Sequence, residues 1–226
     1  MTTMEIFQIS AKDRRSQNTF IEFPFKLYRN TPQWVPPIKS DMRQVFRPHY
    51  AFYQYGEAAF FLAISKSGEV LGRLAVANNH RYNHFHKTKT AFFYYFECIE
   101  DDQVANALFA KGFEWVEHQG LDSVLGPKGF TVLDGFGLLI KGFEHRPAFG
   151  QAYNPQYYAE LIESQGFTKV KDNFSAWVDK SVEVPEKIVR AAELVKKRRG
   201  YSVPLFKSKA DLRKVVNDIQ KLYNES

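Results

Sequence analysis

The 226-residue chain contains a single cysteine and lacks any apolar run long enough to cross a membrane. One thiol, Cys98, excludes an intrachain disulfide, and its place inside an apolar run predicts a buried, unreactive side chain rather than a nucleophile. A membrane-spanning helix needs about 18 consecutive apolar residues, which no stretch here approaches. The first residues, MTTMEIFQISAKDRR, also lack the apolar core of a secretory signal. We therefore expect a cytoplasmic protein without a membrane partner.

What the chain has in quantity is aromatic and apolar side chains. Hydrophobic residues make up 44% of the sequence, with 21 Phe and 12 Tyr, which is enough for a folded core and excludes a disordered chain. The net charge of +6 favours acidic partners. Because the basic residues are scattered along the chain, we do not expect nucleic acid to be a partner.

A central stretch organises the rest of the chain. The apolar run from Ala91 to Ile99 is typical of a strand covered on both faces. Three acids follow, Glu100, Asp101 and Asp102, and then apolar residues recur at three- and four-residue steps as far as Gly120, which predicts a helix. Asp101 or Asp102 would cap this helix and Gly120 would end it. A strand end beside a helix N-terminus is where α/β proteins usually bind ligands.

The remaining elements are expected from periodicity and turn signals. Strands are predicted at residues 4–9, 58–64, 69–77, 122–126, 168–178 and 201–206, and helices at residues 10–28, 38–46, 156–165, 185–199 and 208–223. Pro24 must kink or divide the first helix. Residues 78–89 read as a polar, histidine-rich loop, and residues 127–142 as a glycine-rich one. This order predicts an antiparallel sheet that becomes partly parallel.

The end of the chain resembles its beginning. Residues 201–225 follow the order of residues 5–30: a strand, a Lys-Ala-Asp or Ala-Lys-Asp sequence, and a helix ending in Lys-Leu-Tyr. This weak repeat suggests that a second copy of the domain begins near Tyr201.

Four longer motifs carry a resemblance to a known family. They are FPFKLYRNTPQWVPP at 23–37, VLGRLAVANNHRYNHFH at 70–86, FFYYFEC at 92–98 and YNPQYYAELIESQGF at 153–167. With them the chain resembles the GCN5-related N-acetyltransferase (GNAT) superfamily, and more narrowly the first copy in bacterial proteins with two tandem copies. The resemblance implies an α/β acyl-CoA N-acyltransferase fold, with a mixed, mostly antiparallel sheet flanked by helices. It also implies a GNAT-like domain at 1–180, followed at 181–226 by a linker helix and the start of the second copy.

The resemblance further implies where an acyl donor would bind. In this superfamily the fourth strand splays from the fifth, and its backbone pairs with the pantetheine arm of acetyl-CoA or another acyl-CoA. An open strand edge is suited to this, because it offers N–H and C=O groups to an amide-bearing ligand. The cofactor-binding residues implied here are Phe96, Cys98, Ile99, Gln103, Val104 and Asn154.

Two residues are candidates for proton transfer. Glu97 is the only charged side chain between Ala91 and Ile99, and the family often places its general base on this strand. The alternative is a glutamate on the sheet face paired with a basic neighbour. The family's usual tyrosine acid falls on Ile162 here, so Tyr158, one turn earlier, is the candidate acid; its alternative is packing against the core.

One departure leaves the function open. The family's pyrophosphate loop contains glycine, whereas this chain has Glu-Asp-Asp-Gln-Val-Ala at 100–105, whose three carboxylates would repel a polyphosphate. One hypothesis is transfer of an acyl group from acyl-CoA to a primary amine of a small molecule or peptide. The other is a degenerate, non-catalytic domain that serves as a ligand-binding or interaction scaffold. A homodimer and pairing with a second GNAT-like copy both stay open. No metal is expected, because the histidines at 78–89 have no acid or Cys at ligand spacing.

Overall fold

The structure is a computed structural model that describes residues 4–131, 134–176, 178, 181–200 and 204–225. It divides into two compact units, Met1–Asn173 and Phe174–Ser226. The boundary at residue 180 between a GNAT-like domain and the start of a second copy stays a prediction.

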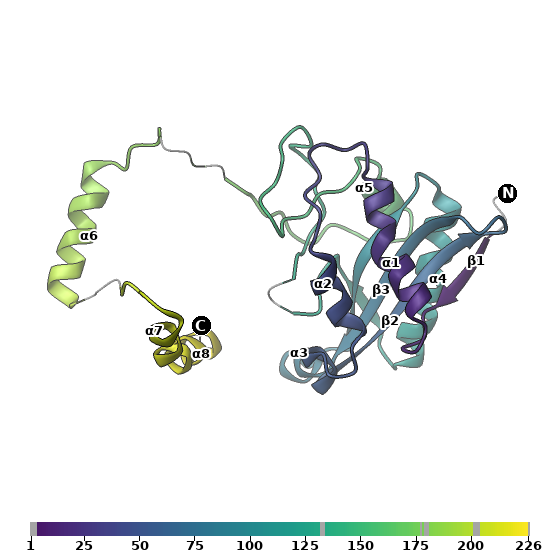
Figure 1. Ribbon diagram of the computed structural model, residues 1–226, viewed down its shortest axis with the longest axis horizontal. Helices are drawn as coiled ribbons and strands as arrows, with labels where there is room; N and C mark the ends of the chain where they lie inside the picture. Colours follow the sequence, from purple (N-terminus) through teal and green to yellow (C-terminus); the bar gives the residue numbers. More distant parts are fainter. Residues whose placement is uncertain (1–3, 132–133, 177, 179–180, 201–203, 226) are drawn as a thin grey trace. The chain divides into compact units, whose positions relative to one another are not determined.

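The first unit is built on one five-stranded sheet (Figure 1). Its strands are β1 (Met4–Gln8), β2 (Gly56–Ser65), β3 (Val70–Asn79), β4 (Thr90–Cys98) and β5 (Ser123–Leu125), and they lie in that order across the sheet. The first three pairings are antiparallel, and β4 pairs with β5 in parallel. The prediction of a mixed, mostly antiparallel sheet is confirmed.

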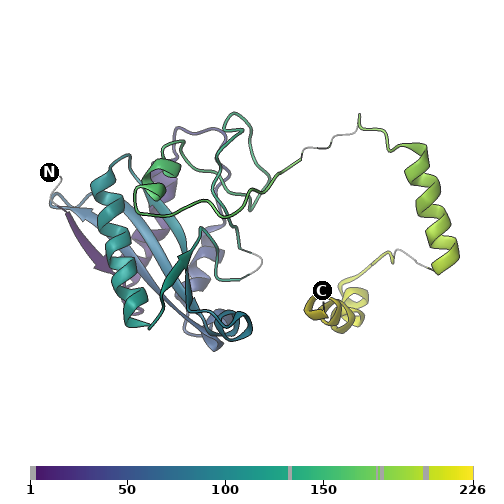
Figure 2. The same ribbon diagram turned by 180° about the vertical axis from the view of Figure 1, so that it is seen from behind.

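Helices cover both faces of this sheet. Helix α1 (Arg14–Leu27) lies over one face (Figure 1), and α4 (Asp102–His118) lies over the other, as seen from behind (Figure 2). A hydrophobic core lies on each face of the sheet, and neighbouring residues of β2 pack into different cores. Phe61 packs in the cluster that contains α4 residues, and Phe60 packs in the cluster that contains Phe20 of α1. Because both faces are buried, the strands are apolar along most of their length rather than alternating.

The helix predictions are partly corrected. Pro24 lies inside α1 and does not divide it. The predicted helix at 38–46 is α2 (Lys39–Met42) followed by a 3-10 turn, Arg43–Phe46, and a second 3-10 turn covers Ala51–Gln54. The polar segment expected to be a loop contains α3 (His80–His86), which Asn79 caps by accepting a bond from the N–H of Tyr82 at 3.0 Å. Helix α4 starts after Asp101 and ends before Gly120, whose φ is +69°, as predicted.

The predicted strand at 168–178 is wrong for the residues that the structure describes. Residues 168–176 and 178 form no helix or strand, and Val170 and Phe174 are 78% and 95% exposed. Apolar alternation alone does not make a strand, because a strand also needs a neighbour to accept its backbone hydrogen bonds.

The second unit contains helices. They are α6 (Glu186–Arg199), α7 (Lys209–Lys214) and α8 (Val216–Glu225), so the helix at 185–199 is confirmed and that at 208–223 is two helices. Of the strand predicted at 201–206, residues 201–203 lie outside the described residues and residues 204–206 are not in a strand. The second copy stays a prediction. Among the helices of the described residues, none combines the length and apolarity needed to cross a membrane.

Candidate functional site

The sheet opens between β4 and β5. The two strands are paired only at Thr90–Ser123, Ala91–Val124 and Phe92–Leu125, whereas β4 continues to Cys98. At the next position the carbonyl of Phe93 accepts a bond from the N–H of Lys128 at 2.8 Å, after β5 has ended. The second half of β4 is therefore not covered by β5, as the resemblance implied.

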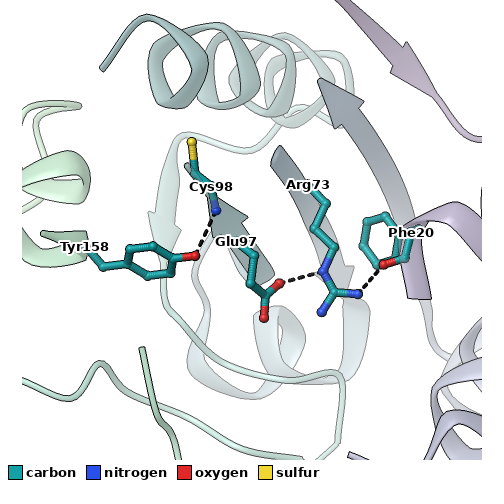
Figure 3. Close-up of polar contacts among 5 residues, drawn as sticks. All are labelled: Phe20, Arg73, Glu97, Cys98 and Tyr158. Carbon is teal, nitrogen blue, oxygen red and sulfur yellow. Dashed lines mark hydrogen bonds and ion pairs between the residues drawn. The ribbon is translucent and has the colours of Figure 1, made fainter. Parts of the chain in front are cut away.

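The backbone of Cys98, in this uncovered half, is already hydrogen-bonded to two phenols. Its N–H donates to the hydroxyl oxygen of Tyr158 at 2.8 Å (Figure 3), and its carbonyl accepts a bond from the hydroxyl of Tyr157, also at 2.8 Å. Both tyrosines stand at the start of α5 (Tyr158–Glu163). The N–H and C=O that an amide-bearing ligand would use are thus occupied by side chains of the same chain.

Ile99 does not belong to the open edge. Its N–H donates to the carbonyl of Leu71 at 3.0 Å, and its carbonyl accepts a bond from the N–H of Asp101 at 2.8 Å. Its assignment to the acyl-CoA site stays a prediction. Phe96 is 6% exposed, and its ring packs against Phe109 and Tyr158 with centroids 4.9 and 5.3 Å apart.

The phenol of Tyr158 is buried beside other acidic groups. Burial is the main cause that raises the pKa of Tyr158 well above its ordinary value, and the nearby Tyr28 and Glu97 raise it further. Burial, then Glu97, likewise raises the pKa of Tyr28. Tyr158 is therefore neutral at physiological pH and holds its proton firmly. Its role as a catalytic acid stays a prediction.

Glu97 is held by an arginine that sequence reasoning did not single out. Arg73 stands opposite Glu97 in the β3–β4 ladder, and its Nε lies 2.5 Å from Oε2 of Glu97 (Figure 3). The Arg73 side chain is 1% exposed and that of Glu97 17%. Nη1 of Arg73 also donates to the carbonyl of Phe20 at 2.6 Å, and its guanidinium lies 4.6 Å from the Phe20 ring centroid. This is the sheet-face pairing that the sequence left as the alternative for Glu97, and the catalytic role stays a prediction.

A signal for Arg73 was present in the sequence. It is the one charged side chain among the apolar residues 70–77. A charge buried in this way must find partners, because an unpaired one would cost several kcal/mol. The pattern could have predicted a buried ion pair, though not its partner.

The first turn of α4 does not fit a polyphosphate. The N–H groups of Gln103 and Val104 donate to Oδ1 of Asp101 at 2.8 and 3.4 Å, which confirms Asp101 as the cap. The amides that would bind pyrophosphate are therefore satisfied within the chain, and Glu100 and Asp102 add negative charge on either side. The start of α4 therefore offers no free amide of Gln103 or Val104 to a CoA pyrophosphate.

Asn154 has a structural position. Its side chain is 5% exposed; Oδ1 accepts a bond from the N–H of Leu139 at 2.7 Å, and Nδ2 donates to the carbonyl of Leu139 at 3.1 Å. It ties the loop after β5 to the segment before α5. The predicted helix at 156–165 begins only at Tyr158, so Asn154 does not cap it.

The thiol of Cys98 is buried, as predicted. Burial raises its pKa to about 12, and the charges of Asp101 and Asp102 raise it in the same direction. A thiol with such a pKa is protonated at neutral pH and is a poor nucleophile.

No model of a known protein family matches the chain. Two curated proteins are similar to it over 187 residues: Protein YghO of Escherichia coli K12, at 27% identity, and a protein named bacterial ceramide synthase of Caulobacter vibrioides, at 25%. The aligned parts cover 80% and 82% of this chain but 47% and 48% of those proteins. The chain thus spans about half the length of the curated relatives it matches.

Solved structures with a similar backbone are acetyltransferases. An aminoglycoside acetyltransferase from a soil metagenome aligns with 78% of this chain and 95% of its own, at 9% identity and a TM-score of 0.48. A GNAT-family acetyltransferase from Staphylococcus aureus Mu50 aligns with 55% and 72%, at 14% identity and a TM-score of 0.41. The strand order, the parallel β4–β5 pair and the opening between those two strands agree with the fold that the resemblance implied. The fold is GNAT-like.

Proposed function

We propose that this GNAT-like chain is part of an N-acyltransferase that moves an acyl group from an acyl thioester, acyl-CoA in the first instance, to a primary amine. The observation that carries the proposal is the position of Glu97. It lies at the end of β4, in the half that β5 leaves uncovered, and Arg73 fixes one of its oxygens. A fixed carboxylate on a strand end that β5 leaves uncovered is placed to take a proton from an ammonium group, which leaves the neutral amine as the nucleophile.

The name of one relative supports the same chemistry. Ceramide is an amide of a fatty acid and a long-chain amine, so a ceramide synthase forms an N-acyl bond. The thioester supplies the activated acyl group, and the chain's own residues would orient the amine and hold the proton. This chain spans about half the length of that relative, so the relative's complete reaction is carried over to this chain as a proposal.

A second candidate function is a non-catalytic half that supports another domain. Two observations favour it: Tyr157 and Tyr158 occupy the Cys98 backbone, and Asp101 satisfies the first amides of α4. A scaffold needs no free strand edge and no anion-binding helix start, whereas an acyl-CoA transferase uses both.

Binding and turnover together separate the two. We would titrate the chain with acetyl-CoA and a long-chain acyl-CoA by calorimetry, and follow thiol release with a panel of primary amines. The transferase proposal expects heat, turnover, and a loss of about 10²–10⁴-fold in kcat for Glu97→Gln. Glu160→Gln, an exposed change on α5, serves as the control. Unchanged turnover in Glu97→Gln would remove Glu97 from the mechanism, and neither heat nor turnover at millimolar ligand would leave only the scaffold.

A further inference from the structure

A cavity of about 490 Å³ lies between the end of α1 and the segment that precedes α5. Its lining includes Tyr28, Phe143, Glu144, Tyr153 and Pro155. This volume is within the range of ordinary small-molecule sites. Glu97 is not among the residues that line it.

The inner wall of this cavity is connected to the candidate site. Tyr28 is 3% exposed, and after burial, the larger cause, its nearby phenol raises the pKa of Tyr158. The Tyr158 oxygen in turn accepts the N–H of Cys98 at 2.8 Å. Tyr28, which lines the cavity, therefore lies near the phenol that is bonded to the uncovered end of β4, and Glu97 raises the pKa of both phenols.

The lining has a distinct chemistry. Three aromatic side chains, Tyr28, Phe143 and Tyr153, form much of the wall, and the hydroxyl of Tyr153 donates to the carbonyl of Phe143 at 3.0 Å, which fixes two of them together. Glu144 is the one charged side chain among the described lining residues, and it is 73% exposed. Among the described residues its one ion-pair neighbour is His145, whose Nε2 lies 3.2 Å from Oε1 of Glu144. Aromatic faces together with a carboxylate favour an organic cation over a neutral or anionic ligand.

We propose that this cavity binds the amine acceptor, as a primary ammonium ion with an apolar or aromatic body. Glu144 attracts the charge at the mouth, and the aromatic wall holds the body. Tyr28 is the lining residue that acts electrostatically on Tyr158. The inference rests on the proposed function, since it names the substrate class of that same site.

Binding is tested first, without any acyl donor. Octylammonium and 1-octanol, which share a chain length and differ in charge, are titrated into the full chain by calorimetry. We expect octylammonium to bind about tenfold more tightly than octanol, by charge and cation–π attraction. Glu144→Gln should weaken octylammonium binding about threefold, as befits an exposed carboxylate, and leave octanol unchanged. Phe143→Ala should weaken both ligands.

Glu163→Gln is the matched control, because it removes the same charge from α5 outside the lining. Equal affinity for octanol and octylammonium, or an equal effect of Glu144→Gln and Glu163→Gln, would overturn the cavity as the ammonium site.

Turnover then separates the two proposals. Acylation of octylamine with a KM that rises in Glu144→Gln and Phe143→Ala, at unchanged kcat, supports both. Turnover whose KM neither variant changes places the acceptor elsewhere, and so overturns the inference while the transferase survives. Octylammonium binding with the expected variant pattern but no turnover supports the cavity and removes the transferase.

Discussion

Arg73 donates a hydrogen bond of 2.6 Å to the carbonyl oxygen of Phe20. In an α-helix that carbonyl would accept from the N–H four residues on. That residue is Pro24, which lies inside α1 and has no N–H. The arginine thus uses an acceptor that the sequence of α1 leaves unpaired, and through Nε it ties the same helix to Glu97 on β4.

Replacing Arg73 should therefore be costly. Arg73→Met leaves the Glu97 carboxylate and the Phe20 carbonyl without their donor, and we expect the free energy of unfolding to fall by roughly 3–5 kcal/mol. Urea unfolding measures it. Lys111→Met is the control, because its ion pair with Glu114 is about half-exposed and should contribute about 1 kcal/mol or less. A loss below about 1 kcal/mol for Arg73→Met would show that the buried pair is not needed.

Pro24→Ala tests the relation between the helix and the arginine. Alanine supplies the helical N–H donor that the Phe20 carbonyl lacks, so this carbonyl no longer depends on Arg73 for a hydrogen bond. We expect Arg73→Met to cost about 1 kcal/mol less in the Pro24→Ala background than in the wild type, which is the contribution of one hydrogen bond. A double-mutant cycle by urea unfolding gives the coupling. Additive effects of the two substitutions would mean that the missing N–H of Pro24 does not strengthen the bond between Arg73 and the Phe20 carbonyl.

Asp101→Asn tests whether a polyphosphate approaches α4. Asparagine caps a helix about as well as aspartate, so stability should change little, while one of three negative charges is removed. Under the transferase proposal we expect acetyl-CoA to bind about threefold more tightly at low salt, and the gain to shrink as salt is added. Calorimetry measures the dissociation constant. Glu117→Gln, at the far end of α4, should leave it unchanged; equal affinities in Asp101→Asn and wild type would place the phosphates away from this helix.

Stability should also fall in alkaline solution because of Tyr94. Burial, then the charges of Asp134 and Glu97, raises the pKa of Tyr94 from 10.0 to about 12. A folded-state pKa above the unfolded value means that the stabilisation is complete below pH 10 and is lost as the pH rises from 10 to about 12. Tyr94→Phe removes the titrating group, so between pH 9 and pH 11.5 it should lose about 1–2 kcal/mol less than the wild type. Urea unfolding at both pH values gives the free energy of unfolding of each protein. An equal loss in Tyr94→Phe and wild type would contradict the raised pKa of Tyr94.

Local patterns in the sequence determined much of this fold. The apolar run of β4, the Asp101 cap, the end of α4 at Gly120 and the order of the strands all follow from periodicity and capping chemistry within a few residues. The mixed sheet follows from that order. The same reasoning failed at residues 168–176 and 178, where the apolar alternation does not reveal whether a neighbouring strand exists.

The tertiary structure alone decided the candidate site. Glu97 could be read from the sequence as a charge on a buried strand, but its partner Arg73 is 24 residues away. The phenol of Tyr158 reaches the backbone of Cys98 across 60 residues, and the side chain of Asn154 is committed to Leu139. Local periodicity carries no information about such contacts, since hydrogen bonds between distant segments depend on how the sheet and helices pack. The sequence thus determined that Glu97 lies on the apolar strand β4. Only the packing decided that Arg73 pairs with Glu97 and that Tyr157 and Tyr158 bind the backbone of Cys98 beside it.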